Sequence, residues 1–553
     1  MILTISKQSL DDLALNHLPP LANYEIGANL LESIPSMRRT VCESASFELK
    51  DWLLGVRNIQ RLVGELSLNH TNERQIKWRT KKLSDPIYNR STINSPLELV
   101  LNDDDDEFDP IFNEKVNIDL KPLLHCIHIY DALSSRSDLR KAYQEDRKSQ
   151  ADLILSQRSS FNQSNFIQSL KNLLQDVVGF FIIEKNVLKS TSGFRSESNV
   201  DDLWDNMCLR ISDVVRQGLS NAQNTQSHVT VKQEVMCFIW TLESYEFNVQ
   251  QLNSLLIALF EEYNILLNQR FKQEFLKVFE NSDQQSMSVG SLNELEEISK
   301  ICWINYDTIN DIYNQDPPIH LPFSNIYPSS CKLLRSFIDE FYKFTDGFTK
   351  TQFSTDTDNI IANSLDKLIS ESIVGSLNEL SQSTYNLSQA TQIVVDITHF
   401  ELAVYEFGNL ISALNGTVYD QSANHSQLNC IKDVNELTTS TMSRINNIIG
   451  NKLDSFFEMA DVEWTPDFST SLKSQINPSE YLKEMMDYLT FISSSVLNNL
   501  PLHLKSQLYT NAIEHISVGI MVCVNCLHEL CKIEVLCRDY LLEVKLNLSM
   551  KEA

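Results

Sequence analysis

Residues Leu124 to Leu155 read LHCIHIYDALSSRSDLRKAYQEDRKSQADLIL, and the apolar run VVGFFII follows at Val177 to Ile183. Within the first stretch, apolar side chains recur mostly at spacings of three to four residues or their multiples. These are Tyr130, Leu133, Leu139, Tyr143, Ala151 and Leu155. Charged residues fill many of the positions between them, as in helices that bury one face. The stretch predicts helices in an all-α scaffold and by itself indicates no function.

Composition extends the all-α prediction to the whole chain. The 553 residues, 42% of them hydrophobic, can form several cores and suggest three or four domains. The 13 glycines and 14 prolines fall well below their average usage of about 7% and 5%. Because these residues mark turns, their scarcity favours long helices with few connections.

Charge and cysteine content indicate the class of protein and its compartment. The net charge of −27 disfavours binding to nucleic acid or to anionic bilayers. The densest basic stretch, KWRTKK at Lys77 to Lys82, is short and typical of a solvated helix face. Eleven cysteines without a disulfide framework favour reduced thiols in the cytosol. With no signal-peptide pattern and no apolar run of about 18 residues, we predict a cytoplasmic protein without direct membrane insertion.

Proline and turn residues divide the chain into three predicted parts. Residues 1–117 hold amino-terminal helices, with short pieces around Pro19 and Pro20, a clear amphipathic helix near Phe47 to Leu66, and a mobile acidic loop at 68–117. Residues 118–315 form a central helical bundle. Residues 316–553 form carboxyl-terminal bundles, because the prolines between Asp316 and Ser330 prevent a continuous helix across this boundary.

Helix ends inside these parts follow the same signals. Breaks in the central part are predicted near residues 134–137, 156–162, 191–199 and 221–227. Helices after the second boundary are predicted at 333–344, 360–380, 384–414, 430–457, 481–497 and 504–546. No repeat of fixed period occurs, so stacked irregular bundles are favoured over a regular solenoid.

The acidic run NDDDDEFDP at Asn102 to Pro110 matches a calcium-binding loop only in part. Counted from Asp103, oxygen-bearing side chains fall at 105, 107 and 109, and a glutamate falls at 114. The sixth position holds Phe108, where such a loop needs glycine for its sharp turn. We therefore predict a solvated acidic linker.

A cluster of metal-ligating residue types lies near the end of the chain. It contains Cys523, Cys526, His528 and Cys531, with Cys537 beyond. Zinc motifs usually separate two ligand pairs by a dozen or more residues, whereas these four fall on a short stretch of predicted helix. Lys532 also stands where a His-Glu-x-x-His protease needs its second histidine. We interpret the cluster as core thiols and predict no metal.

Two further pairs of residues carry histidine. His125 and His128 could share a metal, but their apolar neighbours favour buried core histidines. His399 lies near Glu401, and such a pair alone is no catalytic dyad. The sequence also has no Walker loop, dinucleotide-binding glycine pattern or Gly-x-Ser-x-Gly elbow. We predict a non-enzymatic protein with no cofactor and no catalytic, cofactor-binding or metal-binding residue.

Several short segments resemble one known family, exocyst complex component six, whose members are contacted by Rab GTPases on secretory vesicles. The resemblance is densest at Tyr143, Arg147, Lys148, Gln150, Ala151, Leu153, Leu155, Val178 to Phe181, and Glu184. Further matching segments occur in the same order along the chain. They are Leu31 to Pro35, Leu49 to Leu53, Thr398 to Ala403, Ala460 to Trp464, Tyr488 with Leu489, and Leu500 with Pro501.

The resemblance implies an elongated rod of consecutive antiparallel helical bundles, as in subunits of tethering complexes. It also implies a non-catalytic exocyst subunit that tethers secretory vesicles to the plasma membrane before fusion. The expected partners are other exocyst subunits and a GTP-bound Rab GTPase, which the carboxyl-terminal bundles receive. The expected location is cytoplasmic, and peripheral at vesicles and plasma membrane through these partners. The resemblance assigns no partner-contact residue in this chain.

Family members continue beyond both ends of this chain, so we expect a shortened member with incomplete carboxyl-terminal bundles. Two alternatives stay open. The first is a subunit of another helical-rod tether, at the Golgi or endoplasmic reticulum. The second is a zinc-dependent enzyme built on Cys523 to Cys531.

Overall fold

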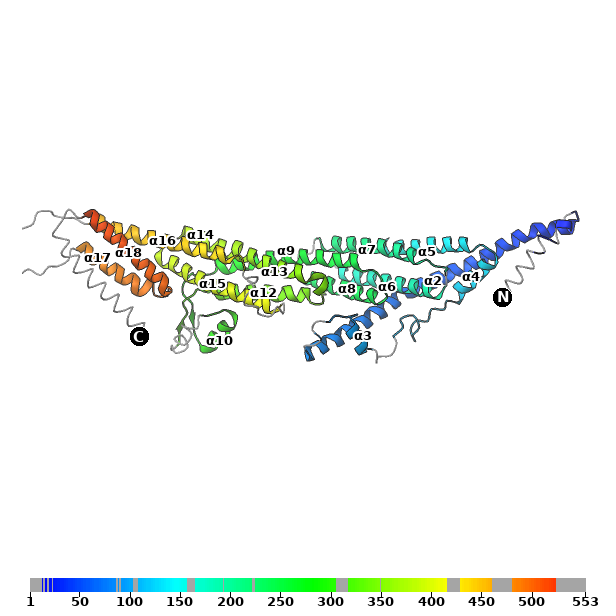
Figure 1. Cartoon of the computed structure of the whole chain (residues 1–553), viewed down its shortest axis with the longest axis horizontal. Coiled ribbons are helices and arrows are strands. Elements are labelled where there is room, and N and C mark those ends of the chain that lie inside the picture. The colour runs from blue at the N-terminus through cyan, green and yellow to red at the C-terminus, as the bar shows by residue number, and fades with distance from the viewer. Residues whose placement is uncertain are drawn as a thin grey trace, which may run out of the picture. The chain divides into compact units, whose positions relative to one another are not determined.

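The computed structural model describes residues 12, 15–16, 19–21, 23–85, 88, 91–102, 108–156, 165–191, 193–220, 224–304, 317–348, 350–414, 428–459 and 480–523. Helices make up nearly all of these residues (Figure 1). In the described ranges, paired strands are limited to one two-residue antiparallel ribbon, β1 (Ser288–Val289) with β2 (Ile319–His320). The all-α prediction is confirmed.

The chain divides into two compact units. Unit 1 is drawn from residues 1–266 and 344–352, and unit 2 from residues 267–343 and 353–553. These limits differ from the predicted boundaries at 117/118 and 315/316, so the three-part division stays a prediction.

Unit 1 is a bundle assembled around the long helix α2. Its helices are α2 (Glu25–Ser84), α3 (Pro96–Asn102), α4 (Lys121–Ala132), α5 (Arg136–Ser156), α6 (Phe166–Ser190), α7 (Glu197–Leu219), α8 (Thr225–Ser244) and the first part of α9 (Gln250–Glu280), after the short 3₁₀ turn η2 (Pro19–Leu21). The 60 residues of α2 span about 90 Å at 1.5 Å per residue. It packs on α4, α6 and α8 (Figure 1). The predicted breaks near 134–137, 191–199 and 221–227 are confirmed, and a further one separates α8 from α9. The predicted break at 156–162 lies almost entirely outside the described residues.

Helix α6 is the core of unit 1. Its apolar run from Val177 to Ile183 is buried on every side, because α2, α5, α7 and α8 all pack against it. By length and composition α6 could also span a membrane, and it is the one such helix among the described residues. However, 72% of its most apolar window is buried inside the protein, as in the core helix of a bundle.

The predicted mobile loop at 68–117 is wrong for much of its length. Helix α2 continues to Ser84, and residues 96–102 form α3. Trp78 stays buried on α2, and its indole donates to the Ser91 carbonyl over 3.2 Å. Arg74 forms a two-point ion pair with the fully buried Glu98 of α3, at 3.1 and 2.5 Å. Apolar periodicity missed this region because polar side chains make its contacts.

Two glycines let the backbones of α2 and α6 touch. A Cβ atom on Gly64 would lie 1.8 Å from the Gln175 carbonyl oxygen, and one on Gly179 would lie 1.7 Å from the Gln60 carbonyl oxygen. Residue 64 therefore faces 175 while 60 faces 179, so the helices cross in opposite directions. Both helices carry the same spacing, Gln-x-x-x-Gly, at the crossing.

An ion pair fixes the same crossing from the side. Arg61, next to Gln60, donates to both carboxylate oxygens of Asp176, at 2.9 and 2.5 Å. This two-point geometry orients the guanidinium and the carboxylate, so it sets the register of α2 on α6. The Asp176 hydrogen bond raises the pKa of Arg61.

The turn that follows α12 (Ile326–Thr345) packs against α8 in unit 1. Gly347 adopts φ +90°, with the side chains of Trp240 and Met236 beside it. The buried Lys232 of α8 donates to the Asp346 carbonyl, and its ammonium lies 5.4 Å from the centre of the Phe348 ring. Burial lowers the pKa of Lys232 to about 8. The lysine thus satisfies a carbonyl just past the end of the helix.

Unit 2 holds the remaining helices and the ribbon. They are the second part of α9, α10 (Leu292–Ile301), most of α12, most of α13 (Lys350–Lys367), the π-helical turn η6 (Leu368–Val374), α14 (Gly375–Ser383), α15 (Leu387–Leu414), α16 (Ile431–Glu458), α17 (Glu480–Phe491), the π-helical turn η8 (Ile492–Val496) and α18 (Leu502–Cys523). Helices α15 to α18 share one apolar core, with α16 in contact with the other three. The helices predicted after residue 330 are present within the described ranges. However, α12 begins at Ile326 and α13 at Lys350, seven and ten residues before their predicted starts at 333 and 360, and Pro328 lies in the first turn of α12.

We expect Gly64→Ala and Gly179→Ala each to lower the thermal unfolding midpoint of the chain clearly. The added methyl group would overlap a backbone carbonyl that cannot rotate away, a change that typically costs about 1–3 kcal/mol or more. Circular dichroism at 222 nm measures the midpoint.

Gly55→Ala is the matched control, because it lies on the same helix and a Cβ there meets no atom within 4 Å. Removing a glycine from an exposed helix interior is expected to stabilise by about 0.5–1 kcal/mol. Equal effects of all three substitutions would show that the close contact is not what requires glycine.

Candidate functional site

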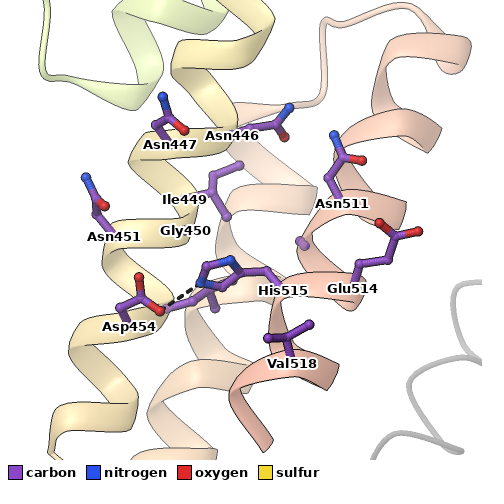
Figure 2. A pocket seen from close by; sticks show the side chains of 12 residues that line it. Asn446, Asn447, Ile449, Gly450, Asn451, Asp454, Asn511, Glu514, His515 and Val518 are labelled. Atoms are coloured by element: carbon purple, nitrogen blue, oxygen red, sulfur yellow. Dashed lines mark hydrogen bonds and ion pairs between the residues drawn. The ribbon is translucent and has the colours of Figure 1, made fainter. Parts of the chain in front are cut away.

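A pocket of about 430 Å³ opens between α16 and α18 in unit 2 (Figure 2). Polar side chains dominate its rim: Asn446, Asn447, Asn451 and Asp454 from α16, and Asn511, Glu514 and His515 from α18. Its apolar lining consists of Ile449, Leu453, Ala512 and Val518. The polar residues recur at spacings of three and four along each helix, so each helix presents one face to the pocket.

One glycine makes room in the middle of the pocket. A Cβ atom on Gly450 would lie 3.4 Å from Cε1 of His515, so the imidazole rests against bare backbone. His515 Nε2 lies 2.8 Å from Oδ1 of Asp454 across the helices (Figure 2). Further along, Gly519 faces the Phe457 ring. Residues 450 and 457 thus pair with 515 and 519, so α16 and α18 run in the same direction.

The polar lining of the pocket consists of carboxamides, carboxylates and one imidazole. Its lining contains no Ser, Thr, Cys or Tyr, so the His515–Asp454 pair has no nucleophile beside it. In the part of the chain that the structure describes, no group of three His, Cys, Asp or Glu side chains could hold a metal ion. Carboxamides and carboxylates remain, and these recognise ligands by hydrogen bonds.

Most of the metal-ligating residue types noted in the sequence lie outside the described residues. Cys526 to Cys537 lie outside the described residues, and Cys523 ends α18 without a described side chain. Residues 103–107 of the acidic run also lie outside them. At the end of that run, Asp109 accepts from the Ile111 amide over 2.8 Å, so its carboxylate is used within a turn.

The interpretation of His125 and His128 as core histidines is wrong, because both are exposed. Helix α4 buries Cys126, Ile127 and Tyr130 instead. Their apolar neighbours misled the prediction, since a helix turns 100° per residue and adjacent residues can face opposite sides. The basic stretch at 77–82 is largely a solvated face of α2, as predicted, with Trp78 buried among its charged neighbours.

Three of the residues that carry the densest resemblance, Tyr143, Arg147 and Glu184, form a buried ionic cluster with Arg195 in unit 1. Glu184 of α6 pairs with Arg147 at 2.6 Å and with Arg195 at 3.0 Å. The Tyr143 hydroxyl donates to the same carboxylate over 2.9 Å. All four side chains are almost completely buried, and the Arg147 guanidinium lies 4.0 Å from the centre of the Phe180 ring.

The charges of this cluster stabilise one another. Burial alone would raise the pKa of Glu184, but Arg147, Arg195 and the hydrogen bonds together lower the pKa below its ordinary value. Burial and the Glu184 charge raise the pKa of Tyr143, so the phenol stays protonated. The cluster ties α5 and the turn after α6 to the core helix, which is a structural role.

His399 and Glu401 do not form a pair among the described residues. His399 Nδ1 lies 2.8 Å from the Val395 carbonyl oxygen, and its ring packs against Phe323 and Tyr327. Burial lowers its pKa.

One turn before His399, the buried Asp396 of α15 accepts from the Ser324 amide over 2.7 Å and from the Ser324 hydroxyl over 2.6 Å. Ser324 precedes α12, so Asp396 fixes the start of that helix from a different helix. Burial raises the pKa of Asp396 to about 6, although these hydrogen bonds favour its charged form.

Comparison with known families assigns the chain. The family described as "Exocyst complex subunit Sec15 C-terminal" matches residues 251–527, and "Exocyst complex component EXOC6/Sec15, N-terminal" matches residues 7–68. The chain belongs to the exocyst Sec15 family. The carboxyl-terminal match includes the pocket between α16 and α18, and the amino-terminal match ends within α2 near the glycine crossing.

Individual Sec15-family relatives match nearly the whole chain at low identity. "Exocyst complex component 6" of Homo sapiens is 23% identical over 528 residues, which is 93% of this chain and 64% of the relative. "Exocyst complex component sec15" of Schizosaccharomyces pombe is 24% identical over 511 residues, 91% of this chain and 64% of the relative. The rat protein "Exocyst complex component 6" is 22% identical over 529 residues with the same coverage as the human one. The chain thus spans 64% of the length of these relatives, and no solved structure gives a significant match.

We expect Glu184→Gln to destabilise this Sec15-family chain by about 3–5 kcal/mol, because two buried guanidinium groups lose their counter-charge. Urea unfolding followed by tryptophan fluorescence measures the loss.

Asp152→Asn is the matched control, since Asp152 pairs with Arg210 at 3.1 Å on the half-exposed surface of the same unit. It is expected to cost at most about 1 kcal/mol. A loss of similar size from both substitutions would contradict a special role for the buried cluster.

We expect the stability contribution of Asp396 to fall as the pH rises. Its folded pKa of about 6 lies above the unfolded value of about 3.9, so the folded chain binds more protons between these values. The unfolding free energy of the wild type should therefore fall relative to Asp396→Asn by about 2–3 kcal/mol between pH 4 and pH 7.

Urea titrations at fixed pH measure this difference, and Asp487→Asn, which removes an exposed carboxylate of the same unit, is the control. A difference between wild type and Asp396→Asn that stays constant over this range would refute the assignment.

Proposed function

We propose that this chain is a non-catalytic exocyst subunit that tethers secretory vesicles to the plasma membrane before fusion and acts as a Rab effector. The observation that carries the proposal is its membership of the Sec15 family, with relatives named as exocyst components matching over 93% of the chain. The partners would be other exocyst subunits and a GTP-bound Rab GTPase. The protein would be cytoplasmic and would reach vesicles and plasma membrane through them.

The chemistry of the described residues supports a binding role. Long helices in closely packed bundles provide extended surfaces, and the pocket between α16 and α18 has polar ligand-binding groups without a nucleophile. The buried charged residues of both units serve structure, since Glu184 joins helices and Asp396 caps one. The three-part division at residues 117 and 315 and the rod-like arrangement of the bundles are part of this proposal.

Affinity purification of the tagged chain from cells tests the tethering role. We expect the other exocyst subunits to be recovered in comparable amounts. Recovery of the subunits of a Golgi or endoplasmic-reticulum tether instead would establish the alternative helical-rod function.

A second experiment tests the Rab part with a panel of purified Rab GTPases, each loaded with a non-hydrolysable GTP analogue or with GDP. We expect the immobilised chain to retain at least one Rab several-fold better in the GTP form, because only that form orders the switch segments that effectors read. Equal retention of both forms by every Rab would remove this part of the proposal. Stoichiometric zinc in the purified chain, lost on Cys523→Ser, would instead favour the zinc-dependent alternative.

A further inference from the structure

The pocket between α16 and α18 offers hydrogen-bonding groups that the fold does not use. In the part of the chain that the structure describes, the side chains of Asn446, Asn447, Asn451, Asn511 and Glu514 make no hydrogen bond or ion pair with the rest of the protein. Asn446 and Asn511 are half-buried and come from facing helices (Figure 2). Half-buried amides without protein partners are available to a ligand.

The lining excludes several classes of ligand. No Lys or Arg lines the pocket, so it has no charge to hold a phosphate, a nucleotide or an acidic headgroup. No Phe, Tyr or Trp lines it, so a sugar ring or a quaternary ammonium group would find no aromatic face. Its rim is too polar for a purely apolar molecule.

The remaining groups match a polypeptide main chain. A carboxamide both donates and accepts, as a peptide group does, so two asparagines on opposite walls can hold one extended strand by its backbone. From Asn446 to Asp454 the pocket runs for about 12 Å along α16. An extended chain advances about 3.3 Å per residue, so three or four residues fit.

The carboxylates of the pocket indicate the charge of the segment that it would bind. Asp454 lies at the far end of the pocket and pairs with His515 at 2.8 Å, and the exposed Glu514 lies one turn from Asn511 on α18 (Figure 2). His515 is the one basic residue among those that line the pocket. Two carboxylates beside one histidine favour a cationic side chain. The apolar lining of Leu453, Ala512 and Val518 can take its aliphatic stem.

We propose that the pocket between α16 and α18 binds a short extended peptide segment carrying a lysine or arginine, held through its main chain by Asn446 and Asn511. The site is independent of the proposed tethering and Rab-effector roles. It gives the chain a means of recognising a basic linear segment of a partner protein.

A synthetic array tests the proposal with the purified full chain. The probes are pentapeptides whose central residue is Arg, Lys, Ser or Glu and whose flanking positions are randomised. We expect the wild-type chain to retain central Arg and Lys peptides at least about fivefold better than central Glu peptides. Absence of any retained peptide, or equal retention of Arg and Glu peptides, would overturn the proposal.

The double variant Asn446→Ala with Asn511→Ala tests the main-chain contact. We expect the retained peptides to bind it about tenfold more weakly, because two hydrogen bonds of about 0.5–1.5 kcal/mol each are lost. The matched control is Asn435→Ala, which removes an exposed asparagine of α16 outside the pocket and should bind as the wild type does. Unchanged binding by the double variant refutes the assignment.

Two further arms separate backbone recognition from charge. A retained peptide with N-methylated amides keeps its charge but loses its donors, and should bind the wild type poorly. The variant Asp454→Asn with Glu514→Gln should bind central Arg and central Ser peptides alike. Full binding of the N-methylated peptide would reduce the site to a charge contact and contradict the proposal. Thermal unfolding midpoints confirm that each variant is folded.

Discussion

The packing of unit 1 depends on a direct contact between the backbones of helices α2 and α6. Gly64 and Gly179 bring two helices within touching distance of each other's carbonyl oxygens, and Arg61 with Asp176 holds the register beside them. Because α5, α7 and α8 also pack on α6, their positions depend on how this crossing places α6 against α2. The ionic cluster around Glu184 lies further along the same helix, so the main buried charges also depend on it.

Unit 2 uses polar groups differently. Asp396 on α15 fixes the first turn of α12, and Ser381 of α14 shares a hydrogen bond with Thr441 of α16. These contacts link helices at single points, whereas a continuous apolar core joins α15 to α18. The pocket lies beside that core, on the side where α16 and α18 present asparagines in place of leucines.

Much of the helical layout was predictable because it depends on local patterns. The apolar run from Val177 to Ile183 predicts a buried helix. The turn residues on either side of it predict where the neighbouring helices end and begin. The extension of α2 to Ser84 was not predictable in this way, since Trp78 stands alone among polar residues and Arg74 is satisfied by Glu98 of another helix. His125 was predicted to be buried because its sequence neighbours are apolar, yet it is exposed. Adjacent residues of a helix can face opposite sides, so apolar neighbours do not show which face a residue occupies. The pocket escaped sequence analysis because Asp454 and His515 lie 61 residues apart and asparagines carry no motif. The Gln-x-x-x-Gly spacing shared by α2 and α6 is the sequence signal of their close crossing.

The glycine crossing has a consequence for how such chains diverge. Each glycine faces a main-chain oxygen of the other helix, and that atom is the same whatever residue occupies the position. A larger side chain on one helix therefore cannot be accommodated by a smaller one opposite. The two positions should each stay fixed on their own, without correlated exchanges, so methods that infer contacts from paired substitutions would overlook the tightest helix contact in unit 1.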